Sequence, residues 1–444
     1  MAICRGGGGY GPPAAPTLGT FPLSVSANGR YLQQADGVPY FLHGDTPWEI
    51  GVRLTRAQID TYLADRQSRG FNAIMFEAIE HHYNSAPAYR NAEGNDPFTT
   101  MSPVAWGSPS ESYWTLIDYI VNEAKARGVY CWIVPAYYGF TSNSQGWDVE
   151  LAAASAGDLQ SYGAFLATRY TQGNVGWVKG GDNDMDSTTR AKQENIFTGI
   201  TSVRSTDLTT AHVFRAASDA ISVWGASAVN VNTIYIPMIC AAPEASTAYA
   251  RSPAEPFFLI EARYENESDW TLAGLRLQAW TAWLSGGCGD LFGVNPLWSF
   301  GDPNAGGDIG AAAALAGYLS TTGTLQRGVM TTFVEALQWH KLVPETGTTL
   351  VTSSLGTGDA LVCPALASDG SFGVVWKNDA SSITVNMAAL APSSVRARWF
   401  DPVDGSYSTV SGSPFANSGT QVIAHPGNNA GGAVDRVLLL DAAP

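Results

Sequence analysis

The feature that most constrains the fold is a series of eight short apolar runs, which alternate with segments of helical periodicity between residues 21 and 340. Runs that are apolar at every position, rather than at every second one, are typical of strands buried on both faces of a parallel sheet. Because the segment is long enough for eight strand–helix units, a closed (β/α)8 barrel fits better than an open sheet. The predicted strands are Tyr40–His43, Phe71–Phe76, Val129–Pro135, Val175–Gly180, Thr209–Phe214, Ile234–Met238, Phe257–Ile260 and Gly289–Gly293.

The segments between these runs carry apolar residues at helical spacing. Thr55 is expected to cap the first helix, and Gly128 is expected to follow the second helix as the residue that ends it. No glycine-rich phosphate fingerprint follows the first strand, which argues against a dinucleotide-binding sheet. The predicted helices are Thr55–Arg69, Ser112–Arg127, Leu159–Tyr170, Thr189–Val203, Trp270–Leu284 and Ala311–Leu342.

The pattern of apolar residues changes after Pro344. Short runs of apolar or period-two character follow one another at intervals of about ten residues, separated by Gly, Ser, Asn and Pro, which is the pattern of a small antiparallel sandwich. We therefore predict a flexible arm at 1–20, a barrel at 21–343 and a β-sandwich at 344–444. The predicted sandwich strands are Thr348–Leu355, Ala360–Pro364, Phe372–Lys377, Ile383–Met387, Val395–Asp401, Gln421–His425 and Val437–Leu440.

Composition narrows the class of partner. The chain has 39 acidic against 24 basic residues and a net charge of −15, so a nucleic-acid partner is not expected. With five Lys and no apolar stretch of about 18 residues, neither a charged membrane anchor nor a membrane span is expected. The 14 Trp and 18 Tyr suit a protein that binds neutral carbohydrate by ring stacking, although a large aromatic core would use the same residues.

The cysteines and the amino terminus bear on metal binding and on localisation. Cys131, Cys240 and Cys288 lie in or beside apolar runs and are expected to be buried free thiols. Without a CxxC pair or a His/Cys cluster, we predict no metal site and no cofactor. The glycine-rich start lacks the apolar core of a signal peptide, so localisation stays undetermined, although a polysaccharide substrate would favour secretion.

Polar residues gather where the predicted strands end. In a (β/α)8 barrel the carboxyl ends of the strands form one rim, and active sites lie there. Strand ends carry the acids Asp45, Glu77, Asp182 and Glu261, while tyrosines, histidines and tryptophans follow several of the same strands. The sequence therefore predicts a rim of carboxylates and aromatic side chains.

Asp182 and Glu261 follow the fourth and seventh predicted strands, so they can flank a substrate from two sides of the barrel mouth. Paired carboxylates of this kind suit glycoside hydrolysis, in which one protonates the leaving oxygen and the other attacks the anomeric carbon or activates water. Each acid has a simpler alternative role: Asp182 could cap the next helix, and Glu261 could pair with Arg263.

Several motifs, taken in order, resemble the apiosidase-like glycoside hydrolases. They are Phe41–Glu49, Arg69–Asn72, Gly180–Asp182, Glu261–Glu265 and Gly286–Trp298, and Trp399–Pro402 resembles the small sandwich that often follows these barrels. The resemblance implies a TIM barrel and a retaining hydrolase, with Asp182 as acid/base and Glu261 as nucleophile. It also implies an activity related to the release of apiose, a branched pentofuranose, from pectin. The acidic stretch Asn183–Asp186 departs from the family pattern and could select another sugar.

We therefore predict a glycoside hydrolase that cleaves a polysaccharide, acting on an apiose-like or arabinofuranose-like linkage. An inverting hydrolase on the same barrel, and a non-catalytic carbohydrate-binding or virion-attachment protein, stay open as alternatives. Strand-end position and residue type suggest further substrate contacts. The residues so predicted are Asp45, Trp48, Glu77, His81, Tyr138, His212, Tyr264, Asn295 and Trp298.

Overall fold

A computed structural model describes residues 18–81, 89–139, 146–183, 187–215, 219–236, 239–268, 270–302 and 308–443. Eight parallel strands form its central sheet, in the order β8-β7-β6-β5-β4-β11-β10-β9. Every residue of these strands is buried, as expected for strands covered on both faces. The strands are β4 (Leu42–Asp45), β5 (Ala73–Glu77), β6 (Tyr130–Val134), β7 (Val175–Gly180), β8 (Thr209–His212), β9 (Asn232–Tyr235), β10 (Phe257–Glu261) and β11 (Gly289–Phe292).

The sheet closes on itself between its two outermost strands. The Val231 amide, just before β9, donates to the carbonyl of Thr209 in β8 at 3.2 Å, and the Thr233 hydroxyl donates to the carbonyl of Ala211 at 2.5 Å. These contacts join β8 to β9 and complete the ring. The predicted (β/α)8 barrel is thus confirmed.

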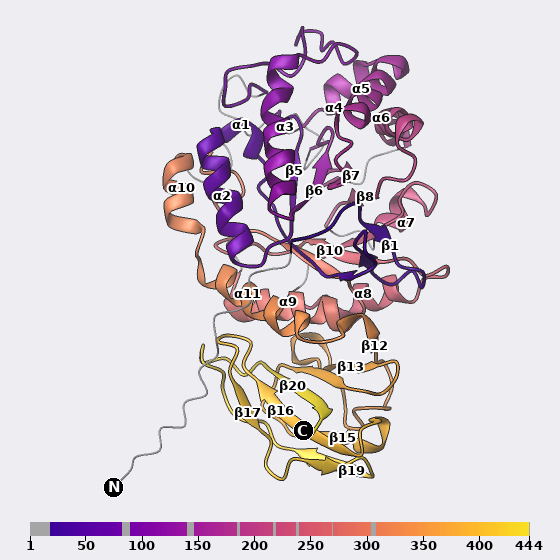
Figure 1. Cartoon of the computed structure of the whole chain (residues 1–444), viewed down its shortest axis with the longest axis vertical. Helices are drawn as coiled ribbons and strands as arrows, with labels where there is room; N and C mark the ends of the chain where they lie inside the picture. Colours follow the sequence, from indigo (N-terminus) through magenta and orange to yellow (C-terminus); the bar gives the residue numbers. More distant parts are fainter. Residues whose placement is uncertain are drawn as a thin grey trace.

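Helices surround the barrel (Figure 1). Two predicted helix ends are confirmed: Thr55 caps α2 in a capping box with Gln58, and Gly128 follows α3 with a φ of 70°. Helices α4, α7 and α8 are too short for the periodic pattern to reveal them. The helices are α1 (Ile50–Arg53), α2 (Arg56–Ser68), α3 (Glu111–Ala126), α4 (Asp148–Ala153), α5 (Ala156–Arg169), α6 (Ser187–Val203), α7 (Ala220–Trp224), α8 (Ala242–Tyr249), α9 (Leu272–Leu284), α10 (Ala311–Tyr318) and α11 (Thr322–Glu335).

The single helix predicted over Ala311–Leu342 is wrong, because the structure divides it into α10 and α11. Thr321 has an extended backbone, and its hydroxyl accepts a hydrogen bond from the Thr324 amide, so it caps a new helix. The carboxylate of Glu265 binds the Thr321 hydroxyl at 2.5 Å and the Gly323 amide at 3.0 Å. Thr and Gly favour helix ends, and here they start a helix against a buried acid.

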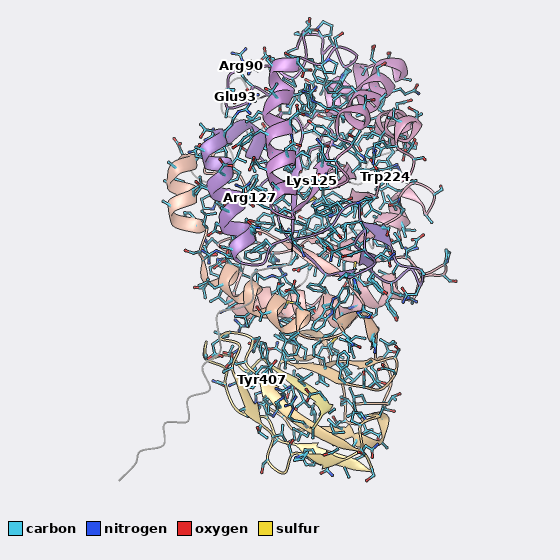
Figure 2. The ribbon with its side chains drawn as sticks, viewed as in Figure 1. Arg90, Glu93, Lys125, Arg127, Trp224 and Tyr407 are labelled. Atoms are coloured by element: carbon cyan, nitrogen blue, oxygen red, sulfur yellow. The ribbon has the colours of Figure 1, made fainter. Side chains whose placement is uncertain are left out.

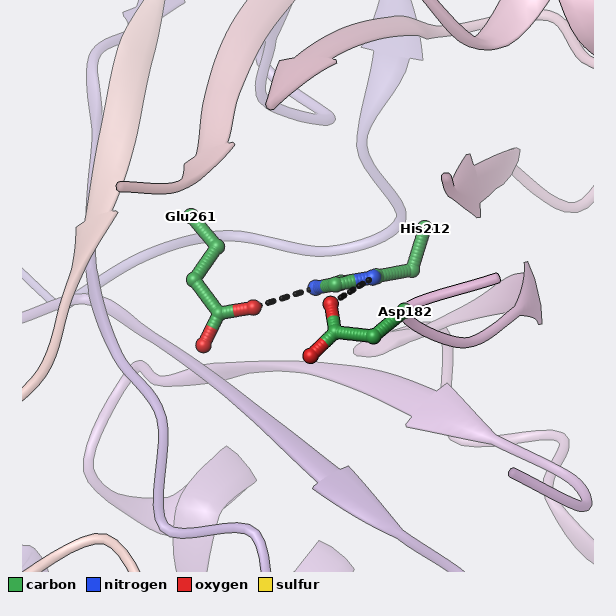
Figure 3. A group of neighbouring side chains, drawn as sticks. All are labelled: Asp182, His212 and Glu261. Carbon is green, nitrogen blue, oxygen red and sulfur yellow. Dashed lines mark hydrogen bonds and ion pairs between the residues drawn. The ribbon is translucent and has the colours of Figure 1, made fainter. Parts of the chain in front are cut away.

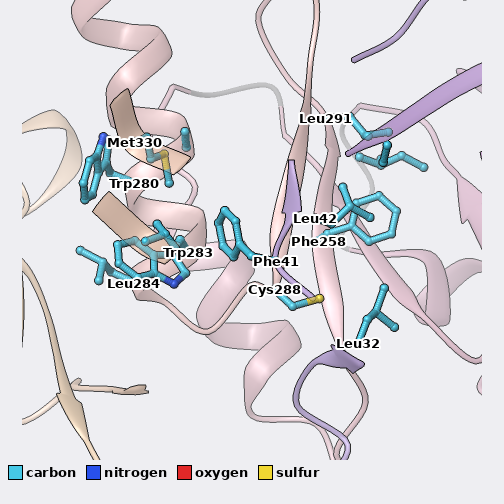
Figure 4. Packing of buried hydrophobic residues seen from close by; sticks show 14 of the residues in the cluster. Leu32, Phe41, Leu42, Phe258, Trp280, Trp283, Leu284, Cys288, Leu291 and Met330 are labelled. Atoms are coloured by element: carbon cyan, nitrogen blue, oxygen red, sulfur yellow. The ribbon is translucent and has the colours of Figure 1, made fainter. Parts of the chain in front are cut away.

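A small antiparallel sheet precedes the barrel and was not predicted. It consists of β1 (Ser24–Val25), β2 (Leu32–Gln33) and β3 (Pro39–Tyr40). Leu32 is fully buried and lies in one apolar cluster with Leu42, at the start of β4, and with Phe258 in β10 (Figure 4). The sheet therefore packs against the amino-terminal end of the barrel, opposite the rim on which an active site is expected.

Antiparallel strands follow the barrel, as predicted. One sheet has the order β12-β13-β14-β20-β16-β17 with β18 beside β16, and β15 pairs with β19 in a second. An apolar cluster that includes Val375, Ile383 and Leu438 draws on both sheets. The strands are β12 (Leu342–Pro344), β13 (Cys363–Ala367), β14 (Gly373–Lys377), β15 (Ile383–Asn386), β16 (Ser394–Phe400), β17 (Tyr407–Thr409), β18 (Phe415–Ala416), β19 (Thr420–Ile423) and β20 (Arg436–Ala442), with 3-10 turns at Trp339–Lys341, Gly358–Ala360 and Met387–Ala389.

One predicted strand of this region, Thr348–Leu355, is wrong. The structure has only an isolated bridge there, between Val351 and Val385. Leu350 and Val351 are fully buried in the cluster between the sheets, so the apolar character of this segment reflects packing rather than a strand.

The antiparallel region packs under α9 and α11 of the barrel (Figure 1). Trp280 of α9 stacks on Trp376 of β14, with ring centroids 5.7 Å apart and planes at 19°. The Arg276 guanidinium donates to both carboxylate oxygens of Asp435, at 2.7 and 2.8 Å, and both side chains are buried. One apolar cluster runs through this junction without interruption.

The abundance of tryptophan mainly serves the core: of the 14 tryptophans, all but Trp224, Trp270 and Trp298 are buried. Charged side chains such as Arg90, Glu93 and Lys125 lie on the outside of the barrel (Figure 2). The three cysteines predicted to be buried free thiols are so, together with Cys363. Among the described residues, no helix is both long and apolar enough to cross a membrane.

Candidate active site

Four polar side chains meet at the carboxyl ends of neighbouring strands. His212 is the last residue of β8, Tyr235 of β9 and Glu261 of β10, while Asp182 follows the end of β7 by two residues. Because parallel strands bring their carboxyl ends to one rim, residues far apart in sequence come together there.

A glycine pair delivers Asp182 to this rim. Gly180 has a φ of 85°, in the left-handed region that glycine adopts at little cost. A Cβ on Gly181 would lie 2.8 Å from the ring of Tyr137 and 3.0 Å from the Tyr138 amide. The two glycines thus let the chain turn sharply and pass close to the segment that follows β6.

His212 lies between the two acids that were predicted to be catalytic (Figure 3). Its Nε2 is 2.6 Å from Oε2 of Glu261, and its Nδ1 is 3.3 Å from Oδ1 of Asp182. Figure 3 shows that the second oxygen of each carboxylate points away from the imidazole, on the same side of the group. One oxygen of Asp182 and one of Glu261 lie within 4.8 Å of each other.

The three side chains differ in their access to solvent. The side chain of Asp182 is 18% exposed and that of Glu261 is 9% exposed, whereas His212 is fully buried. The ring of His212 meets Trp48 edge-on at 5.5 Å and Tyr235 at 4.9 Å. A substrate can therefore reach the carboxylates but not the imidazole.

Glu261 has a second partner in Tyr264, whose hydroxyl hydrogen-bonds to its carboxylate. That hydroxyl in turn accepts from the Trp48 indole N–H at 2.9 Å and from the Thr46 hydroxyl at 2.7 Å. Since these donors occupy the lone pairs of the Tyr264 oxygen, its own proton is directed to Glu261. Two donors, from His212 and Tyr264, thus face this carboxylate.

The surroundings of Asp182 favour its protonated form. Burial, and then the charge of Glu261, raise the pKa of Asp182 to about 7. Burial by itself would lower the pKa of His212, but the carboxylates of Asp182 and Glu261 outweigh it and leave the pKa raised. Asp182 can therefore hold a proton near neutral pH, as a general acid must.

Among the described residues, Asp182, His212 and Glu261 are the group whose donor atoms lie near enough to suggest a metal ion. The observed contacts do not suit one. Two ligands of a tetrahedral ion, each about 2.0–2.2 Å from it, lie about 3.3 Å apart. Nε2 of His212 and Oε2 of Glu261 are 2.6 Å apart, which is a hydrogen-bond distance with no room for an ion.

Other predicted contact residues have partners of their own. The carboxylate of Asp45 accepts from the Tyr62 hydroxyl at 2.6 Å and the Thr46 amide at 2.9 Å, and it pairs with Arg66 at 3.1 Å. Asp45 is thus tied to α2, and each of its carboxylate oxygens already has a partner. Trp48, in contrast, forms a wall of the site against His212.

The structure places Glu77 and His81 in different surroundings. Glu77 ends β5 and is buried, and burial followed by the charge of Glu80 raises its pKa well above the ordinary value. His81 pairs with Glu150 at 3.1 Å and meets the Trp147 ring at 4.7 Å. Neither residue has a described contact with Asp182, His212 or Glu261.

Three further predicted residues lie on other parts of the rim. The Tyr138 hydroxyl hydrogen-bonds to Thr189 at 2.7 Å. Asn295, after β11, has a buried side-chain oxygen to which no described residue donates a hydrogen bond, and Trp298 is half-buried beyond it. A buried amide oxygen of this kind is a candidate acceptor for a hydroxyl group. His82 and Asp184 lie outside the described residues.

Sequence reasoning missed Tyr235 and Arg215, which both act on Asp182. Tyr235 hydrogen-bonds to this carboxylate, and the positive charge of Arg215 favours its ionised form. Tyr235 was hidden because its strand was predicted to continue to Met238, which made a strand-end tyrosine look internal. Pro237 was the available signal, because a proline seldom continues a central strand.

The chain matches a known family of proteins. The model of the family described as "Apiosidase-like, catalytic domain" matches residues 26–341. The chain belongs to this family. A second model, of a family provisionally named as the collagen-binding domain of a collagenase, matches residues 343–441 of this apiosidase-like protein.

Solved structures agree in fold with the apiosidase-like chain. A glycoside hydrolase family 5 protein from Bacteroides vulgatus ATCC 8482 is 21% identical with a TM-score of 0.79, over 95% of this chain and 93% of that one. A second structure, described as a glycoside hydrolase, is 22% identical with a TM-score of 0.79, over 96% and 99%. At these identities the likeness shows a shared fold and no more. No curated protein matches the chain.

Proposed function

We propose that this apiosidase-like protein is a retaining glycoside hydrolase that cleaves a pentofuranoside linkage in a poly- or oligosaccharide. Glu261 is the nucleophile and Asp182 is the acid/base. The observation that carries the proposal is the close approach of their carboxylates, whose oxygens come within 4.8 Å at a partly open rim.

The spacing favours retention over inversion. Retaining enzymes have carboxyl groups about 5–5.5 Å apart, whereas inverting enzymes need about 6.5–9.5 Å to hold a water molecule between base and sugar. An oxygen of Asp182 and an oxygen of Glu261 within 4.8 Å of each other suit the shorter spacing better than the longer one. This spacing favours direct attack by one carboxylate.

The surroundings of each acid support its role. Burial and the charge of Glu261 raise the pKa of Asp182 to about 7, so it can keep a proton for the leaving oxygen. Glu261 faces hydrogen-bond donors from His212 and Tyr264, which stabilise the ionised form that a nucleophile requires.

The reaction then takes two steps. Asp182 gives its proton to the glycosidic oxygen while a Glu261 oxygen bonds to the anomeric carbon, and the bond from that carbon to the leaving oxygen breaks. Asp182, now a carboxylate, takes a proton from water. The resulting oxygen nucleophile replaces Glu261 at the anomeric carbon, which restores both side chains and the original configuration.

A pentofuranoside substrate is supported by family membership and by the character of the rim. The Trp48 ring lies edge-on to His212 and to Tyr137, and thus forms an aromatic wall beside the carboxylates. Loop shapes decide which pentofuranoside is bound.

The test uses purified protein, aryl pentofuranosides and a panel of polysaccharides. Glu261→Ala should abolish turnover of every substrate, whereas Asp182→Ala should retain activity on nitrophenyl glycosides, whose leaving group needs little protonation. Added azide should rescue Asp182→Ala with retained configuration and Glu261→Ala with inverted configuration.

Glu265→Gln is a matched control, because this acid follows the same strand but binds Thr321 and Gly323. It should keep most of the activity. The assignment fails if Asp182→Ala and Glu261→Ala remain active while Glu265→Gln is inactive. Tight binding of a polysaccharide without release of sugar by the wild type would instead support a non-catalytic binding protein.

A further inference from the structure

His212 has no route to a substrate, yet it contacts both proposed catalytic acids. Its side chain is fully buried, and the rings of Trp48 and Tyr235 cover it. A buried polar ring with a carboxylate at each nitrogen is costly unless protons are distributed to suit both contacts.

The two contacts of the ring are not equivalent. Nε2 and Oε2 of Glu261 are 2.6 Å apart, a short hydrogen bond. Nδ1 and Oδ1 of Asp182 are 3.3 Å apart and both are buried, and the backbone of Gly181 also hydrogen-bonds to the ring of His212. Of the groups described at Nδ1, the Asp182 carboxylate is the one that can exchange a proton with the ring, because a backbone carbonyl cannot be protonated near neutral pH.

The charged and titratable groups around His212 come from every neighbouring strand. They are Asp182 after β7, Arg215 after β8, Tyr235 at the end of β9, and Glu261 and Tyr264 at and after β10. Burial raises the pKa values of Tyr235 and Tyr264 well above the ordinary value, so both hydroxyls stay neutral. The proton that can move in this group therefore belongs to Asp182 and His212.

We propose that His212 is a positioning residue that shares one proton with Asp182 across the Nδ1–Oδ1 contact while its Nε2–H remains on Glu261. This inference rests on the proposed function of the two acids. In one form the imidazolium lies between two carboxylates; in the other, neutral imidazole lies between protonated Asp182 and ionised Glu261.

The two forms have the same net charge and the same number of protons, and they differ only in the position of one proton. To pass between them, the proton leaves Nδ1 and bonds to Oδ1 of Asp182, and the electron pair of the N–H bond stays on the ring. Glu261 keeps the Nε2–H donor in both forms, so the nucleophile stays ionised while Asp182 becomes an acid. His212 thereby couples the two roles that a retaining reaction needs at the same time.

The kinetic test compares two amide substitutions. His212→Gln can retain a donor toward Glu261 but has no proton to share, whereas His212→Asn can reach toward Asp182 but loses the donor to Glu261. For His212→Gln, the basic limb of the kcat/KM–pH profile should move to lower pH. The shift is about 0.3 pH unit if the two forms are equally populated, and more if the imidazolium form dominates.

Two other results would overturn the inference. An unmoved basic limb would mean that His212 holds the site together without sharing a proton. A limb that moves to higher pH would mean a permanent imidazolium that merely keeps Asp182 ionised. His212→Asn should lower kcat more than His212→Gln, because only Asn deprives the nucleophile of its donor. Circular dichroism and urea unfolding would verify that both variants fold.

A spectroscopic test does not depend on turnover. In protein labelled with 15N-histidine, the Nδ1 signal of His212 should lie between the protonated and unprotonated positions near neutral pH. It should move to one limit in Asp182→Asn. His43, buried and with a pKa lowered by burial and by Arg327, is the internal control and should not respond.

An Nδ1 signal at one limit in the wild type, unchanged by Asp182→Asn, would refute proton sharing even if hydrolysis is established. Conversely, a shared proton in a protein that hydrolyses nothing would leave the His212 inference standing and reject the proposed function. The two failures are thereby distinguishable.

Discussion

Replacing Asp435 with Ala should remove about 3–5 kcal/mol from the free energy of unfolding, because it leaves a buried charge without its partner. The Arg276 guanidinium makes two bonds to this carboxylate, at 2.7 and 2.8 Å, and the exposed fractions of the two side chains are 5% and 0%. After the substitution, the described partner that remains to Arg276 is Gln326, at 2.7 Å, which carries no charge.

Urea unfolding followed by tryptophan fluorescence would measure this effect, since Trp280 and Trp376 stack at the same junction. The double variant Arg276→Met/Asp435→Leu should recover most of the loss, because an apolar pair needs no desolvation of charge. Asp369→Ala is the control: its pair with Lys341 is exposed and screened by solvent, so its loss should lower the free energy of unfolding far less. A loss for Asp435→Ala no larger than that of the control would refute the reasoning.

Three further predictions concern other buried groups. Burial, and then the charge of Glu80, raise the pKa of Glu49, so the folded protein retains a proton that the unfolded chain releases. The free energy of unfolding should therefore fall as the pH rises above about 4.5, and Glu49→Gln should flatten the dependence of Tm on pH. Glu265→Ala should lower the free energy of unfolding in urea by about 1–3 kcal/mol, because the Gly323 amide at the start of α11 loses its acceptor. Tyr264→Phe should lower kcat by about tenfold or more, because Glu261 loses a charge-assisted hydrogen bond, and it should also lower Tm, because Trp48 and Thr46 lose a buried acceptor. A kcat that stays within about twofold would exclude that role for Tyr264.

The barrel could be predicted because its strands are continuously apolar, which few other arrangements require. Strand-end position then brought Asp182, His212 and Glu261 to one rim, since parallel strands share one carboxyl end. What could not be predicted is which rim acids are already bound. Asp45 has the same strand-end position as Glu261, but Tyr62 and Arg66 of α2 bind one of its oxygens and the Thr46 amide binds the other.

The short strands were harder to predict for a different reason. β1 and β18 have two residues each, too few for a period to appear. The buried segment around Leu350 has the composition of a strand but fills a gap between two sheets. The break before α11 depends on Glu265, an acid more than 50 residues away, whose contact with Gly323 no local pattern reveals.

The burial of α9 limits how this protein can change over evolution. Every residue from Gly274 to Leu284 is buried, so the helix has no face suited to water. One of its sides is covered by the antiparallel region through Trp280 and Arg276. Loss of that region would expose several apolar residues of α9 to water, so several substitutions would be needed together. The loops at the barrel mouth do not form this contact and can change one at a time. New sugar preferences should therefore arise in lineages that keep both parts of the chain together.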